Sequence, residues 1–145
     1  VVVGGQVLNK NTDKESYNLY KKEREELLNF LVQQKISGVV FLSGDRHHTE
    51  ILKDESVKEK LGYSLYDITS SPLSSGVSNV LKTDEAKNPQ RVPNTLTVEQ
   101  NYCSIRISGK KGERIALVTC YDKNGLVKWG YQIPESELKT GADKK

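Results

Sequence analysis

The sequence contains no methionine, only two cysteines and only two histidines in 145 residues. Without a methionine the chain is not a complete, unprocessed translation product, so we interpret it as part of a longer protein whose N-terminal half is missing. The N-terminus lacks the basic start, apolar middle and small-residue cleavage site of a signal peptide. No apolar stretch approaches the roughly 20 residues that a transmembrane helix needs, so no membrane span is expected.

The chain also lacks an excess of charge of one sign. It has 22 basic and 19 acidic residues spread along its length, for a formal net charge of +3. Without a basic stripe, nucleic acid is not an expected partner. Internal repeats and heptad runs are absent, and the length is that of one ordinary domain.

The two cysteines, Cys103 and Cys120, fall on predicted neighbouring strands without CxxC or Cys/His spacing, so a zinc site is not expected. They are either buried free thiols or a cross-strand disulfide. We favour free thiols, because the assumed register does not clearly set the two residues opposite each other. The cysteines therefore do not indicate whether the protein works in an oxidising or a reducing compartment.

The first part of the chain predicts a strand, a helix and a second strand. Residues 1–8 (VVVGGQVL) form the apolar, β-branched run of a strand buried on both faces. Residues 17–35 carry apolar side chains at three- and four-residue spacings, with Tyr20 and Phe30 on the expected packing face. Residues 39–44 (VVFLSG) are a second apolar strand. This order predicts a right-handed crossover between parallel strands.

The middle of the chain is less regular. Residues 51–62 indicate a short helix that ends at Gly62, and residues 63–71 a third strand. Residues 71–94 are rich in Ser, Pro, Asn and Gly, which predicts a long surface loop.

From Leu96 onward polar and apolar residues alternate over three segments, which predicts an antiparallel meander. The strands are joined by GKKG at 109–112 and by Asn124-Gly125, where we expect a type I′ turn. We therefore assign residues 1–134 to one domain and residues 135–145 to a polar, frayed tail.

Both histidines lie in the stretch GDRHH, directly after the second predicted strand. Ligand sites in α/β sheets lie beyond the carboxyl ends of parallel strands. If strand geometry persists, Asp45 and His47 face one side and His48 the other. A carboxylate with an imidazole suits Fe, Mn or Zn, and Arg46 could offset phosphate charge. Spacing alone leaves a solvated surface loop as an equal alternative.

Other candidate sites are weaker. Gly4-Gly5 lacks the remaining glycine of a dinucleotide fingerprint, and the serines at 70–75 lack both a nucleophile elbow and a base. Arg24 and the neighbouring tyrosines are expected to pack, and Glu50 is expected to be solvated rather than to act as a ligand.

Four blocks in this order, GGQVLN, KEREELLNFL, KISGVVFLSGDRHHTEI and YDITSSPLSSG, resemble the C-terminal half of alkaline phosphatase D-like proteins, which are calcineurin-like metallophosphoesterases. The resemblance covers about residues 1–80, and the meander is similar to the closing strands of that domain. The superfamily's last metal-binding motif is commonly Gly-His-x-His at a strand end, and in this branch it is similar to Gly-Asp-x-His. It corresponds here to Gly44-Asp45-Arg46-His47.

The resemblance implies that Asp45 and His47 each bind a metal of a multinuclear centre (Fe, Ca, Mn or Zn). Arg46 and His48 match no motif ligand and are candidate phosphate contacts or supports for the ligands. The implied fold is half of a metallophosphoesterase-type α/β sandwich, and the implied protein is periplasmic or secreted in a bacterium.

The implied reaction is hydrolysis of phosphate monoesters and diesters by metal-activated hydroxide. The superfamily's earlier motifs, which provide most of the ligands, are missing from these 145 residues, so the chain alone is expected to be nearly inactive. Self-association is expected through apolar surface that the missing half would cover. The alternative is a non-enzymatic α/β module whose GDRHH and serine-rich loops bind an anion or a partner protein.

Overall fold

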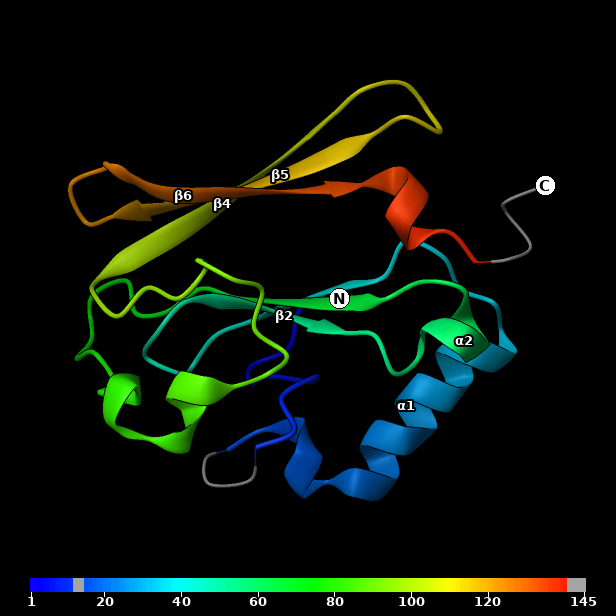
Figure 1. Ribbon diagram of the computed structural model, residues 1–145, viewed down its shortest axis with the longest axis horizontal. Coiled ribbons are helices and arrows are strands. Elements are labelled where there is room, and N and C mark those ends of the chain that lie inside the picture. Colours follow the sequence, from blue (N-terminus) through cyan, green and yellow to red (C-terminus); the bar gives the residue numbers. More distant parts are fainter. Residues whose placement is uncertain (12–14, 141–145) are drawn as a thin grey trace.

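The computed structural model of the protein describes residues 1–11 and 15–140. Two three-stranded sheets lie one above the other, and helix α1 (Lys21–Gln33) covers the outer face of one of them (Figure 1). The fold is therefore mixed α/β with two small sheets and few helices. No helix within the described ranges is long and apolar enough to cross a membrane.

The first sheet is mixed and has the order β1-β3-β2. Strand β1 (Val40–Ser43) runs parallel to β3 (Leu65–Thr69), and β2 (Glu50–Asp54) runs antiparallel to it. All five residues of β3 are buried, because this strand has a hydrogen-bonded neighbour on both sides and packed layers on both faces.

The N-terminal segment pairs with β1 in the expected parallel sense, but only through a bridge between Val2 and Leu42. The prediction of an opening strand buried on both faces is wrong, because the side chain of Val2 is 81% exposed. The buried apolar residues of this segment are Val7 and Leu8, which follow Gly4-Gly5 and pack into the core on the helix side of the sheet.

Helix α1 follows a short 3₁₀ turn, η1 (Tyr17–Leu19), and buries Leu31 against the sheet. Two residues predicted on its packing face, Tyr20 and Phe30, are exposed. The face is instead completed by Arg24, which donates to the carbonyl oxygen of Val7 at 2.8 Å and forms an ion pair with Asp54 at 3.5 Å.

Residues 51–62 differ from the prediction of a helix. Their first part belongs to strand β2, and helix α2 contains only Lys58–Leu61, ended by Gly62 at φ 94°. The physical reason is that Ile51 and Leu52 face opposite sides of a sheet that is covered on both faces. Consecutive apolar residues in such a strand have the same local pattern as a buried helix.

The mixed sheet separates two apolar cores. Alternate residues of a strand point to opposite faces, so Phe41, Leu52 and Leu65 pack toward α1, whereas Ile51 and Tyr66 pack toward the second sheet. The polar side chains at the carboxyl end of β1 lie on the α1 side, which places the candidate site beside the helix-side core.

The second sheet is the predicted antiparallel meander. It consists of β4 (Asn101–Ser108), β5 (Ile115–Asp122) and β6 (Val127–Pro134), in that order. Val118, Ile133 and the half-buried Trp129 pack from it into the core between the sheets.

The turn before β6 is not type I′. Of Asn124 and Gly125, only the glycine has a positive φ, at 84°. The carboxylate of Asp122 accepts from the backbone N–H groups of Asn124 and Leu126 at 2.8 and 2.9 Å, which fixes a turn capped by a side chain.

The predicted frayed tail is partly folded. Residues 135–138 form the 3₁₀ helix η4 (Glu135–Leu138), Leu138 packs against both apolar cores, and Glu137 accepts from the Tyr66 hydroxyl at 2.8 Å. The description of a frayed tail is therefore wrong up to Thr140, and residues 141–145 lie outside the described residues.

Candidate functional site

The stretch 44–48 leaves the carboxyl end of β1 and turns toward β2. Backbone hydrogen bonds hold it in place: Gly44 donates to the carbonyl of Gly4 at 3.2 Å, and the carbonyl of His47 accepts from Ser78 at 2.8 Å. The N–H of His47 donates to the Ser71 hydroxyl at 3.1 Å. Serines of the long loop therefore position this stretch, and the expected absence of a catalytic base for them remains a prediction.

Asp45 and His47 both adopt left-handed backbone conformations, with φ of 64° and 56°. Strand geometry does not persist here, so the reason given for placing these two side chains together is wrong. Asp and His tolerate this region better than most residues, although it costs non-glycine residues free energy. The turns redirect the chain after each of the two residues.

Asp45 and His47 nevertheless face the same cavity, which has a volume of about 330 Å³. The full lining is Glu15, Asp45, Arg46, His47, His48, Ser78, Val80, Thr83 and Glu85. Asp45 is exposed and His47 is half-buried. Within residues 1–11 and 15–140, neither side chain has a hydrogen bond or an ion pair.

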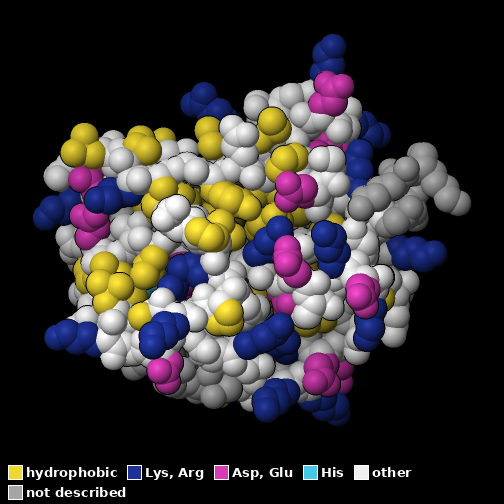
Figure 2. Space-filling view, viewed as in Figure 1, with side chains coloured by type: hydrophobic (Ala, Val, Ile, Leu, Met, Phe, Trp, Pro, Cys, Tyr) yellow, Lys and Arg dark blue, Asp and Glu magenta, His cyan; other side chains and the backbone are white. Residues whose placement is uncertain are grey.

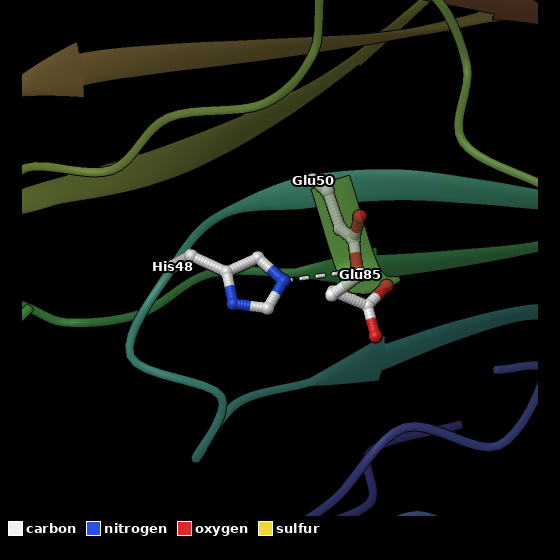
Figure 3. A group of neighbouring side chains, drawn as sticks. All are labelled: His48, Glu50 and Glu85. Carbon is white, nitrogen blue, oxygen red and sulfur yellow. Dashed lines mark hydrogen bonds and ion pairs between the residues drawn. The ribbon is translucent and has the colours of Figure 1, made fainter. Parts of the chain in front are cut away.

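His48 is fully buried, so the interpretation of both histidines as solvated is wrong for this one. Its Nδ1 lies 2.9 Å from the carbonyl oxygen of Arg46. Its Nε2 lies 3.0 Å from Glu50 Oε1, as Figure 3 shows. Both partners are acceptors, so both contacts are hydrogen bonds when the imidazole carries two protons. His48 thus connects the loop to β2.

Glu50 is also fully buried, contrary to the expectation that it is solvated. Its carboxylate accepts from Gln6 at 2.7 Å and from Arg91 Nε at 2.6 Å, in addition to His48. Burial alone would raise the pKa of Glu50, but the hydrogen bond and charge of His48 and the charge of Arg91 outweigh it and lower the pKa. Glu50 is therefore an ionised, fully paired carboxylate.

Glu85 approaches from the long loop, in the 3₁₀ helix η3 (Asp84–Lys87) that follows η2 (Val80–Lys82). It forms ion pairs with Arg46 at 3.0 Å and with Arg91 at 3.6 Å. We name Arg46, His48, Glu50, Glu85 and Arg91 the buried polar cluster.

Three residues of the buried polar cluster could in principle hold a metal. Ligand atoms of His48, Glu50 and Glu85 all lie within 4.8 Å of one another (Figure 3). The guanidinium groups of Arg46 and Arg91 already contact the two carboxylates and neutralise them. A cation placed there would face two desolvated positive charges, so the arrangement fits a structural charge network better than a metal site.

A further buried carboxylate, Asp67 of β3, lies on the same face of the mixed sheet as the polar side chains at the end of β1. It accepts from the backbone N–H groups of Val7 and Leu8 at 2.7 and 3.1 Å and from the Ser43 hydroxyl at 2.7 Å. Burial raises its pKa despite these hydrogen bonds. The hydrogen bonds of Asp67 therefore hold the N-terminal segment next to the end of β1.

Sequence reasoning identified the loop but missed Glu85, Arg91 and Gln6. All three reach the site from distant positions, as the Gln6–Glu50 hydrogen bond and the Arg46–Glu85 ion pair illustrate. No local motif marks them, because a glutamate in a polar loop has the same sequence pattern whether it is solvated or buried.

A second, larger cavity of about 700 Å³ lies between the β4–β5 hairpin and η4 and is lined in part by Ile107, Ile133 and Leu138. Hydrophobic side chains gather on the face between the two layers in Figure 2. No candidate ligand of the GDRHH stretch lines this cavity.

Comparison with known proteins adds no family assignment: no family model, curated protein or solved structure matches this chain.

Proposed function

We propose that this chain supplies two metal ligands, Asp45 and His47, to a metallophosphoesterase-type phosphoester hydrolase whose other ligands lie outside these 145 residues. The observation that carries the proposal is the alternation along the loop. Asp45 and His47 face the cavity with unpaired side chains among the described residues, whereas Arg46 and His48 are held by internal partners. Two side chains that bind a metal must be free of other hydrogen-bond and ion-pair partners in this way.

The donor set fits a transition metal, because one carboxylate oxygen and one imidazole nitrogen suit Fe, Mn or Zn, and Ca is also compatible with the carboxylate. The metal, when bound, would activate water and offset charge on the phosphoryl oxygens. This chain would hold the two ligand side chains on a loop. Arg46 and His48 of that loop are held in place by hydrogen bonds to buried partners. Two ligands are fewer than the four to six positions that a tightly bound metal usually takes, so the chain alone binds weakly.

A second candidate function is binding of an anion without a metal. It is favoured by Arg46, which lines the cavity and has a buried Nε without a hydrogen-bond partner in the described part of the chain. Against it stand two further carboxylates in the same lining, Glu15 and Asp45, while the charge of Arg46 is already offset by Glu85. Because these two carboxylates add negative charge to the lining, the cavity favours a cation over an anion.

The proposal is tested in the full-length protein with Asp45→Ala and His47→Ala. Loss of either ligand should lower the turnover number for a p-nitrophenyl phosphate ester by at least about a hundredfold, or roughly 2.7 kcal/mol of transition-state stabilisation. The free energy of unfolding should hardly change, because neither side chain has a partner among the described residues.

The matched control is His48→Ala, with turnover expressed per folded molecule. This variant should unfold more easily because it removes one of the buried partners of Glu50. Near-normal turnover in both ligand variants would exclude the proposal. For the isolated chain we expect Zn²⁺ or Mn²⁺ to be lost on desalting and no hydrolysis above a buffer control. Phosphate binding by the metal-free chain that requires Arg46 would support the second candidate.

A further inference from the structure

The two cysteines of the meander lie directly opposite each other. Cys103 on β4 is the register partner of Cys120 on β5, which the sequence pattern did not clearly predict. Both are free thiols in this structure, with Cys120 fully buried and Cys103 half-buried. The reason for doubting a cross-strand disulfide therefore no longer applies.

Backbone hydrogen bonds identify the type of pair that they form. The N–H of Cys103 donates to the Ser70 hydroxyl at 3.0 Å, and the N–H of Asn101 donates to the carbonyl of Pro72 at 2.8 Å. These groups point away from β5, so Cys103 and Cys120 occupy a non-hydrogen-bonded position of the ladder. Opposing Cα atoms at such positions are about 4.5 Å apart, within the range that a disulfide spans.

The thiols already interact. A hydrogen bond to Cys120, together with burial, raises the pKa of Cys103, and the same hydrogen bond lowers the pKa of Cys120. Cys120 Sγ also lies 3.7 Å from Thr97 Oγ1 and from Asn101 Oδ1. The two sulfur atoms are thus neighbours on the inner face of the hairpin, and only Cys103, on an edge strand, is partly open to solvent.

We propose that Cys103 and Cys120 are a site of reversible oxidation, at which a small-molecule disulfide such as oxidised glutathione produces an intramolecular cross-strand disulfide. Cys103 attacks one sulfur of the oxidant, giving a mixed disulfide and one reduced thiol. Cys120 then attacks Cys103 Sγ and releases the second thiol. The protein loses two protons and two electrons, and the oxidant is reduced to two thiols.

The exposure of the two residues fixes this order, because the buried Cys120 is reached only through Cys103. Since the raised pKa keeps Cys103 protonated at neutral pH, formation should be slow there and faster in alkali. The bond would close the β4–β5 hairpin and restrict the unfolded chain. This inference is independent of the proposed function, because neither cysteine lines the cavity at Asp45 and His47.

The test incubates the folded chain with oxidised glutathione and then blocks the remaining thiols with an alkylating agent. Intact mass spectrometry should show an unalkylated monomer lighter by about 2 Da than the reduced protein. The melting temperature should rise by roughly 6 to 12 °C and return after treatment with dithiothreitol.

Cys103→Ser is the matched control. It changes a half-buried position, should fold, and should show no such rise in melting temperature. Cys120→Ser provides a second variant, in which the half-buried thiol of Cys103 should react only as far as a stable mixed disulfide. Full double alkylation of the wild-type chain after prolonged oxidation, or cross-linked dimers in place of the 2 Da loss, would overturn the proposal.

Discussion

The pocket-facing pair, Asp45 and His47, and the buried polar cluster use the same residue types in different ways. In the buried polar cluster, every carboxylate and guanidinium has an oppositely charged partner within 2.6–3.6 Å. In the pocket-facing pair, a carboxylate and an imidazole lie beside the same cavity without a partner among the described residues. The comparison teaches that burial and pairing, rather than residue type, separate side chains that support a loop from those available to a ligand.

The largest effect should follow from breaking the buried polar cluster. Glu85→Ala removes the partner of Arg46 and one partner of Arg91, and leaves Arg46 buried with an uncompensated charge. We expect the free energy of unfolding in urea to fall by about 3–5 kcal/mol.

The matched control for that variant is Glu55→Ala, which removes a carboxylate paired with Lys53 at 3.0 Å on the surface. Exposed pairs of this kind contribute little to stability, because solvent screens them. If both variants lost the same small amount, the buried polar cluster would not support the fold.

An intermediate effect is expected from pH, with opposite signs at Asp54 and Asp67. Burial raises the pKa of Asp67 above its ordinary value of 3.8, so its contribution to stability falls as the pH rises from 3.8 toward the folded-state pKa. Burial also acts to raise the pKa of Asp54, but hydrogen bonds from Ser56 and the charge of Lys10 outweigh it. The contribution of Asp54 is therefore present above 3.8 and lost as the pH falls through its lowered pKa.

The two signs can be distinguished by measuring urea unfolding of Asp67→Asn and Asp54→Asn between pH 2 and 7, a range that includes the region below 3.8 where the contribution of Asp54 is lost. Relative to wild type, the first variant should gain stability as the pH rises and the second should lose it, by about 1.4 kcal/mol for each unit of pKa difference. Parallel profiles for the two variants would contradict the assignment.

The smallest effect should come from His47→Gly. Its left-handed backbone, at φ 56°, is strained for histidine and free for glycine. The strain relief exceeds the entropy that glycine loses, so we expect a gain of about 0.5 kcal/mol in the free energy of unfolding. The same change at His48 should instead cost on the order of 3 kcal/mol, because Glu50 loses a buried partner. A loss at both positions would show that His47 also supports the fold.

The sequence predicted those features that depend on neighbouring residues. Alternation indicated the three strands of the meander, and an apolar run before Gly44 indicated β1 with a polar loop at its end. Features that depend on distant partners were missed. Strand β2 was mistaken for a helix because both of its faces are buried, and the burial of Glu50 depends on Gln6 and Arg91.

The position of Trp129, the only tryptophan of the sequence, gives the molecule a built-in optical probe. The indole packs into the core between the sheets, and its Nε1–H donates to Thr97 Oγ1 at 2.9 Å. Its fluorescence therefore reports on separation of the meander from the mixed sheet, whereas far-ultraviolet circular dichroism follows the melting of α1 on the opposite face. If the two signals change together, both layers unfold cooperatively. If they change separately, one layer opens before the other.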